Sequence, residues 1–252
     1  PYYYLSICFV NVCLSIGLNV YFIQFLNFGL LGAVFALVAV SCVQFILLCP
    51  IMVSCFRWDL FNRALLQKMI RFGLPFFPAS VFFILIEMSD RWMLGYFKGV
   101  EEVGLYGAGY KIGSIVLLLV RGFNLNWQPY YLKKTQADTT KTFAIIGTNF
   151  ILILLFFSTI ITSMWPIAFQ YHWGPYNLIG QSFWEGGKII PIVAVSYILY
   201  GLFILQMPSI YLKNKQNWTP LFWGFGFVIN VVANLYLIPR LGIYGAAYGT
   251  LL

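Results

Sequence analysis

Five ionisable side chains stand out because they interrupt long apolar stretches of the chain. Glu87, Asp90 and Arg91 lie in one stretch, and Lys111 and Arg121 lie in the next. A charged group in a membrane interior is costly and usually faces the inside of a helix bundle, a wet cavity or an ion path. These five residues are therefore the candidates for binding or coupling chemistry.

The spacing of these residues brings four of them to a similar depth. At ~1.5 Å per residue, Glu87, Asp90 and Arg91 lie roughly 15, 11 and 9 Å from the outer end of their stretch, and Lys111 lies about 12 Å from the outer end of the next. Glu87 also shares a helix face with Asp90 and Arg91. The sequence predicts a cluster of both charge signs, which either pairs internally for packing or lines a substrate or ion path.

A polar stripe follows the second of these stretches. At about 100° per residue, one side of the helix carries Lys111, Ser114, Leu118, Arg121 and Gln128. Gly109 and Gly113 fall on the opposite side, where small residues allow another helix to approach closely. An inward lysine and arginine suit a phosphate or an acidic sugar. Alternatively, Arg121 reaches the lipid headgroups from its position near the interface.

The elements that must position these residues are membrane-spanning helices. Hydrophobic residues make up 61% of the 252 residues and charged residues only 9%, which departs from the composition of soluble domains. A span needs roughly 20 mostly apolar residues. The sequence predicts an all-α, multispanning bundle of seven spans, with an eighth beginning near Tyr244. The predicted spans cover residues 2–26, 30–55, 74–97, 103–127, 142–166, 189–212 and 219–238.

The loops between these spans differ in basic residues. Alternate loops hold nine: Arg57, Arg63, Lys68, Arg71, Lys133, Lys134, Lys141, Lys213 and Lys215. The intervening loops hold three: Lys98, Lys188 and Arg240. Cytoplasmic loops are enriched in lysine and arginine, so the first set is assigned to the cytoplasm and the loop with His172 to the outside.

Several function classes are disfavoured by what the sequence lacks. The net charge of +8 comes from scattered basic residues, whereas a nucleic-acid surface gathers them into a patch, so no nucleic-acid partner is expected. No metal site is expected, because His172 has no Cys or carboxylate at ligand spacing. The sequence also has no nucleotide-binding loop and no Ser, His and acid arrangement, so neither a cofactor nor catalysis is expected.

Three motifs resemble those of a known family. They are RFGLPFFP at residues 71–78, SDRWMLGYF at 89–97 with VGLYGAGYKI at 103–112, and IPRLGIYGAA at 238–247 with Asn234 and Thr250. Over residues 71–250 the chain is similar to the polysaccharide transporter family, the Wzx-type O-antigen flippases. That family belongs to the multidrug, oligosaccharidyl-lipid and polysaccharide exporter superfamily, whose members have two six-helix lobes around a central cavity.

The resemblance implies a fragment of a two-lobe, twelve-helix transporter. Residues 1–56 would be the last two helices of the N-terminal lobe, 57–73 a cytoplasmic interlobe loop, and 74–252 the C-terminal lobe, cut at the start of its last helix. The first 70 residues fit the family only through hydrophobicity and a glycine turn. The location implied is the bacterial inner membrane.

The resemblance also implies a function and roles for the charged residues. The family moves an undecaprenyl diphosphate-linked oligosaccharide from the cytoplasmic to the periplasmic leaflet by alternating access. Lys111, Arg121 and Arg91 are the predicted substrate-binding residues, while Glu87 and Asp90 are predicted to act in gating or ion coupling. The expected partners are the lipid-linked oligosaccharide, membrane lipid, and H+ or Na+ as the candidate coupling ion.

Two other functions stay open at this stage. A cation-coupled multidrug exporter of the same superfamily would be expected to place acidic groups in its cavity for cationic drugs, whereas the charges here are balanced or basic. A multispanning polysaccharide polymerase or acyltransferase would be expected to have a large outer loop with catalytic residues. The longest outer loop here is only about 22 residues, at 167–188, which disfavours that enzyme.

Overall fold

Helices dominate the computed structural model, which describes residues 2–55, 57, 61–133, 139–173, 176–177, 179–213 and 215–252. Within a bilayer a backbone finds no water, so helices satisfy its N–H and C=O groups internally. Six helices of the described chain are long and apolar enough to cross a membrane, or seven if one bent pair counts as a single span. The predicted all-α multispanning fold is confirmed. Two-residue strands β1 (His172–Trp173) and β2 (Tyr176–Asn177) form a short hairpin beside it.

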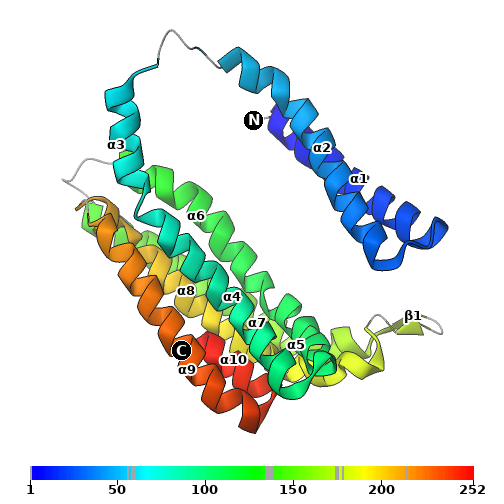
Figure 1. Ribbon diagram of the computed structural model, residues 1–252. Helices are drawn as coiled ribbons and strands as arrows, with labels where there is room; N and C mark the ends of the chain where they lie inside the picture. Colours follow the sequence, from blue (N-terminus) through cyan, green and yellow to red (C-terminus); the bar gives the residue numbers. More distant parts are fainter. Residues whose placement is uncertain are drawn as a thin grey trace. The chain divides into compact units, whose positions relative to one another are not determined.

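Contacts within the chain divide it into two compact units, Pro1–Leu66 and Gln67–Leu252. The first unit is a hairpin of α1 (Tyr2–Val20), the π-helical turn η1 (Tyr21–Phe25) and α2 (Gly29–Cys55) (Figure 1). Its two helices are joined by a hydrogen bond from Asn11 Nδ2 to Gln44 Oε1, 2.5 Å long. The predicted spans 2–26 and 30–55 correspond to this hairpin. The assignment of the hairpin to an N-terminal lobe stays a prediction.

The segment predicted as a loop over 57–73 contains a helix, α3 (Arg63–Gly73), and in this respect the prediction was wrong. Asn62 starts the helix, because its Oδ1 accepts hydrogen bonds from the backbone N–H groups of Ala64 and Leu65 at 2.9 and 3.1 Å. Among the residues of the predicted loop, 58–60 lie outside the described part of the chain. The role of this segment as an interlobe connection stays a prediction.

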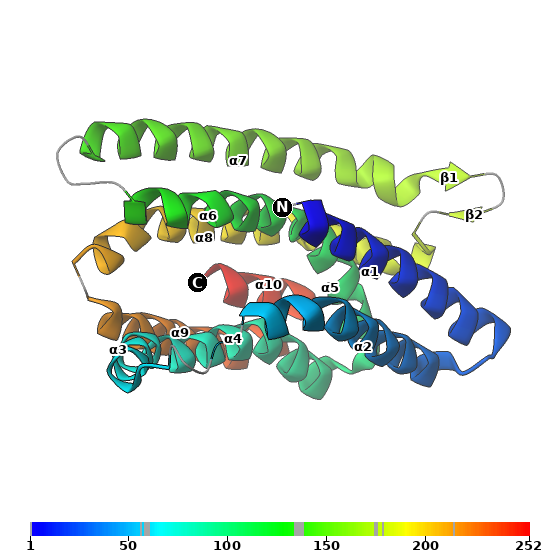
Figure 2. The same ribbon diagram turned by 90° about the horizontal axis from the view of Figure 1, so that it is seen from above.

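The second unit is a bundle of antiparallel helices. It contains α4 (Phe76–Lys98), α5 (Val100–Gly113), α6 (Ile115–Lys133), α7 (Thr139–Gln170), the 3-10 helix η4 (Gln181–Ile189), α8 (Ile190–Tyr211), the short η5 (Gln216–Trp218), α9 (Thr219–Leu241) and α10 (Ile243–Leu251). Helix α4 packs mainly on α9, α9 on α10, and α8 on both α6 and α7. One end of this bundle holds the start of α4, the end of α6, the start of α7, the end of α8 and the start of α9 (Figure 2). These are the helix ends that flank the lysine- and arginine-rich linkers.

The predicted span 103–127 is bent rather than continuous. Helices α5 and α6 meet at Ser114 with an angle of 44°. The Ser114 hydroxyl donates to the carbonyl of Lys111 at 2.9 Å, and the N–H of Leu117 donates to the Ser114 carbonyl at 3.0 Å. These bonds span three residues instead of four, which tightens the turn and redirects the helix.

Helix α5 uses its glycines to approach η4 and α8. A Cβ atom on Gly109 would collide with the backbone carbonyl of Gly186, and one on Gly113 would lie 2.8 Å from Cβ of Val193. Both glycines are buried. The predicted close approach on the glycine side of this helix is therefore confirmed.

Two glycines of α5 offer a matched test of this contact. Gly109→Ala should lower the thermal stability of the purified protein by an amount equivalent to about 1–3 kcal/mol, because a backbone carbonyl must move to admit the methyl group. Gly107→Ala meets open space and should raise stability by up to about 1 kcal/mol, because alanine favours a helix. Equal melting temperatures for the two variants in detergent would contradict the close contact.

Candidate functional site

Asp90 is the most enclosed charged residue of the predicted set, with 1% of its surface exposed. Four neutral donors from three other helices surround its carboxylate. They are Tyr106 OH from α5 at 3.0 Å, Asn230 Nδ2 and Asn234 Nδ2 from α9 at 3.3 and 2.6 Å, and Thr250 Oγ1 from α10 at 2.6 Å. We call these five residues the Asp90 cluster. It ties α4, α5, α9 and α10 together at one point.

The two asparagines reach Asp90 because they lie four residues apart on one face of α9. Asn230 is fully engaged: its Oδ1 accepts from Ser89 Oγ at 2.6 Å and its Nδ2 donates to the carbonyl of Gly249 at 2.9 Å. Asn234 is 0% exposed, yet its Oδ1 has no hydrogen-bond partner. A buried amide oxygen without a donor is uncommon and costs free energy. The Asp90 cluster therefore includes a buried amide whose nitrogen reaches the carboxylate and whose oxygen, next to Gly249, accepts no hydrogen bond.

Glu87 lies one helical turn before Asp90 and contacts a different set of side chains. Its Oε1 accepts hydrogen bonds from the hydroxyls of Tyr110 on α5 and Tyr197 on α8, each at 3.3 Å. The two hydroxyl oxygens are 2.5 Å apart. Glu87 is thus linked to α8 through a pair of tyrosines, whereas Asp90 is linked to α9 and α10.

Internal ion pairing, one of the two alternatives predicted for this cluster, is not seen among the described residues. No ion pair there joins Glu87 or Asp90 to Arg91 or Lys111. Arg91 instead lies over the ring of Tyr110, 4.8 Å from its centre, and donates to the Glu87 carbonyl at 3.3 Å. Lys111 is exposed. It follows Tyr110 by a rotation of about 100°, so when the tyrosine faces the acids the lysine faces away.

The polar stripe keeps its place despite the bend between α5 and α6. Arg121 is exposed like Lys111, although the buried Leu117 lies one turn before it on the same face of α6. Both cations therefore remain accessible in this unit. Their predicted contact with a substrate stays a prediction.

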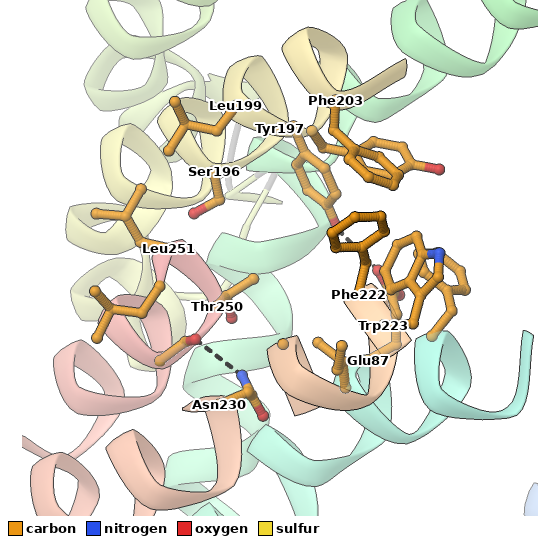
Figure 3. Close-up of a pocket in the computed structure, with 16 residues that line it drawn as sticks. Glu87, Ser196, Tyr197, Leu199, Phe203, Phe222, Trp223, Asn230, Thr250 and Leu251 are labelled. Atoms are coloured by element: carbon orange, nitrogen blue, oxygen red, sulfur yellow. Dashed lines mark hydrogen bonds between the residues drawn. The ribbon is translucent and has the colours of Figure 1, made fainter. Parts of the chain in front are cut away.

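A cavity of about 280 Å³ opens between α4, α8, α9 and α10, beside both carboxylate sites (Figure 3). Glu87, Asn230 and Thr250 reach its wall. The rest of the lining is largely apolar and aromatic and includes Phe83, Tyr197, Tyr200, Phe203, Phe222 and Trp223. Neither Lys111 nor Arg121 is among its lining residues. The cavity offers flat apolar surfaces and one carboxylate rather than anion-binding groups.

Sequence reasoning missed most of the partners of the two acids. The residues without a predicted role are Tyr106, Tyr110, Tyr197, Asn230, Asn234 and Thr250. The spacing of four in both Tyr106/Tyr110 and Asn230/Asn234 was a usable signal, because such pairs share a helix face. For Tyr197, which comes from a helix distant in sequence, no local signal exists.

The chemistry of the Asp90 cluster suits a small hard cation or a proton. Its oxygens come from one carboxylate, amide groups and a hydroxyl, which are the ligand types that hard metal ions prefer. The part of the chain that the structure describes contains no group of three or more His, Cys, Asp or Glu residues placed to hold a metal ion together. The side chain of His172 lies outside the described residues.

Comparison with known proteins identifies the family. A family model described as polysaccharide biosynthesis protein matches residues 4–134. The chain belongs to this polysaccharide biosynthesis family. The matched range includes the motifs at 71–78, 89–97 and 103–112 as well as the N-terminal hairpin, whereas the motif at 238–247 lies beyond it. Comparisons with curated proteins and with solved structures return no match.

Membership in the polysaccharide biosynthesis family indicates the kind of protein in which the site lies. The recognition made from the motifs is confirmed, and the match extends it to the first hairpin. The family consists of transporters rather than enzymes, so the arrangement of Asp90 and its neutral donors is to be understood as part of a multipass membrane transporter.

Substitutions of Thr250 test how much the Asp90 cluster contributes to the free energy of unfolding. Thr250→Val keeps the shape of the side chain but removes the hydroxyl that donates to Asp90, so unfolding should become easier by about 1.5–3 kcal/mol, as for a hydrogen bond to a charged group. Thr250→Ser retains the hydroxyl and should lose less. Thermal unfolding in detergent measures both, and an unchanged Thr250→Val variant would contradict the bond.

Proposed function

We propose that the chain is part of a flippase that moves an undecaprenyl diphosphate-linked oligosaccharide from the cytoplasmic to the periplasmic leaflet of the bacterial inner membrane. The family match supports a transporter of polysaccharide biosynthesis. The proposed mechanism is alternating access between two lobes. The chain would contribute residues 1–56 to the first lobe, 57–73 to the connection, and 74–252 to the second.

The observation that carries this proposal is the buried carboxylate of Asp90, which has no basic partner. Its four partners are neutral donors, and an uncompensated charge in a membrane interior is expensive. Binding of H+ or Na+ would remove that cost. The Thr250 hydroxyl, 2.6 Å from the carboxylate, would supply a further oxygen ligand for a sodium ion.

Cation binding at the Asp90 cluster would act on helix packing. The cluster joins α4, α5, α9 and α10, so replacing its hydrogen bonds by ion contacts changes the relative stability of two arrangements of these helices. A ligand shifts a conformational equilibrium only as far as its affinities for the two states differ. The hydrogen-bond rearrangement at Asp90 is a source of such a difference. Glu87, with its two tyrosines, is a second proposed gating group beside it.

The cargo would be recognised by the basic residues. Lys111 and Arg121 are exposed on one side of α5 and α6 and would attract the diphosphate, for which arginine offers a fork of donors and lysine a compact charge. Arg91 is half-buried against Tyr110 and would meet the substrate after movement of α4. The polyprenyl tail would remain in the lipid.

Asp90→Asn should abolish coupling to the cation. In the wild-type protein, either Na+ in place of choline or a lower pH should raise the melting temperature, because a bound cation stabilises the folded state by about 2.7 kcal/mol at one hundred times its dissociation constant. Asp90→Asn should remove this response and slow gradient-driven flipping in vesicles. Flipping is measured by the access of an external quencher to a fluorescent undecaprenyl diphosphate sugar.

A control with the same change in charge keeps this test specific. Glu101→Gln alters an exposed carboxylate of α5 and should leave both responses intact. A wild-type protein that responds to neither Na+ nor pH, or an Asp90→Asn variant that keeps its response, would remove Asp90 as the coupling site.

Lys111→Ala and Arg121→Ala should each slow flipping of the lipid diphosphate at equal expression, on the order of tenfold for the loss of one charge-assisted contact. Lys98→Ala removes an exposed lysine outside the polar stripe and should have no effect. Normal rates for both stripe variants would contradict the proposed headgroup site. Efflux of an organic cation that depends on Glu87 would instead favour the drug-exporter alternative.

A further inference from the structure

Helix α3 is the most strongly amphipathic of the described helices. At about 100° per residue, one side of it, an arc of roughly 160°, carries only apolar side chains. These are Leu65, Leu66, Met69, Ile70 and Phe72. We call this side the apolar face of α3.

The rest of α3 is basic. Arg63, Lys68 and Arg71 occupy the remaining arc together with Gln67, and the helix contains no acidic residue. By the same rotation, Arg63 and Lys68 lie near the two edges of the apolar face. This arrangement places positive charges at the level where an apolar surface would meet water.

No element of the unit Gln67–Leu252 covers the apolar face of α3. Its side chains are 42% exposed at Leu66 and up to 63% exposed at Met69, and α3 makes no extensive contact with another described element. Five large apolar side chains on one short helix form a patch that water does not favour. A surface outside this unit must therefore cover it.

The length of the chain places α3 outside the hydrocarbon layer. Helices α3 and α4 form one run of 36 residues, Arg63–Lys98, which is about 54 Å long against a hydrocarbon thickness of about 30 Å. Helix α4 alone is 23 residues long and spans about 35 Å. Because α4 crosses the bilayer, α3 must begin at its surface, on the lysine- and arginine-rich side.

Helix α3 continues into α4 with a bend of less than 40°, but the junction between them lacks two of the usual helical hydrogen bonds. Pro75 has no N–H group to donate to the carbonyl of Arg71, and Pro78 has none for Leu74. Phe77 instead donates to the Leu74 carbonyl at 3.2 Å. Residues 73–75 can therefore change angle with little loss of hydrogen bonding, and α3 can tilt while α4 stays upright.

We propose that α3 is a binding site for anionic phospholipid, lying along the membrane surface with its apolar face between the lipid chains. Arg63, Lys68 and Arg71 then contact the phosphate groups. An amphipathic helix with a basic polar side binds a membrane in this way, and each basic residue near an anionic surface adds attraction. The proposal does not depend on which cargo the protein carries.

A lipid surface fits α3 better than a protein partner does. The apolar arc is wide and flat, and its basic edges complement phosphate groups on both sides. The covering surface must also lie immediately beside the start of α4, which is where the bilayer surface lies. In this position α3 would set the tilt of α4, the helix that carries Glu87 and Asp90.

Hydrogen–deuterium exchange of the full-length protein in lipid nanodiscs tests the proposal. One sample contains phosphatidylcholine alone, and the other contains phosphatidylcholine and phosphatidylglycerol in equal parts. The amides of residues 66–73 should exchange more slowly in the second sample, on the order of tenfold. The amides of α4 and α9 report whether the protein remains folded and should not differ.

Matched variants identify the charges responsible. The triple change Arg63→Gln, Lys68→Gln and Arg71→Gln should remove the difference between the two lipids. The change Lys133→Gln, Lys213→Gln and Lys215→Gln lowers the net charge equally at other exposed sites and should preserve it. The double change Met69→Gln and Ile70→Gln should speed exchange of α3 in both lipids.

Three results would overturn the proposal. One is equal exchange of the wild-type α3 in the two lipids. Another is a lipid difference that survives the triple change in α3. The third is unchanged exchange of α3 in both lipids after the double change Met69→Gln and Ile70→Gln, which would show that its apolar face is not inserted between lipid chains.

Discussion

The second unit depends on one constraint: a carboxylate is buried where no water can solvate it. Asp90 has 1% of its surface exposed and receives four hydrogen bonds from α5, α9 and α10. Since each of these donors must come from the protein, the positions of three helices relative to α4 are fixed at one depth. Neutral donors satisfy the carboxylate without cancelling its charge. The same interaction that holds the helices together therefore leaves a negative charge, which the proposed mechanism neutralises with a cation.

Helix α5 helps to surround the two acids because its glycines allow close packing and its tyrosines donate hydrogen bonds to Glu87 and Asp90. Gly109 and Gly113 allow the backbone to lie directly against η4 and α8, which brings Tyr110 within 2.5 Å of the Tyr197 hydroxyl. One turn earlier on nearly the same side of the helix, Tyr106 donates to Asp90. Small residues favour close packing where lipid provides no hydrophobic driving force. The glycine contact thus positions the tyrosines, and the tyrosines in turn complete the environment of both acids.

The sequence predicted features that depend on local pattern. Apolar length located the spans, the glycine spacing indicated the packed side of α5, and the rise per residue placed Glu87, Asp90 and Lys111 at a similar depth. Predictions that depend on the choice among neighbouring partners were wrong. Lys111 and Tyr110 differ by one position, so a rotation of about 100° decides which faces the acids, and that rotation is set by packing against α8. The helix within 57–73 was missed because its apolar residues are mixed with three basic ones.

Asp90 and Lys111 do not pair with each other, and the proposed transport mechanism depends on this. Had Lys111 paired with Asp90, each charge would have satisfied the other, and neither would have been available to an ion or a lipid diphosphate. Tyr106 and Tyr110 occupy the inward positions instead, so Asp90 is held by neutral groups. Lys111 and Arg121 remain exposed. Because Tyr110 and Lys111 are consecutive, any rotation of α5 that follows cation binding at Asp90 also moves Lys111. In the proposed mechanism, this covalent link carries the effect of cation binding to the residues that would meet the cargo.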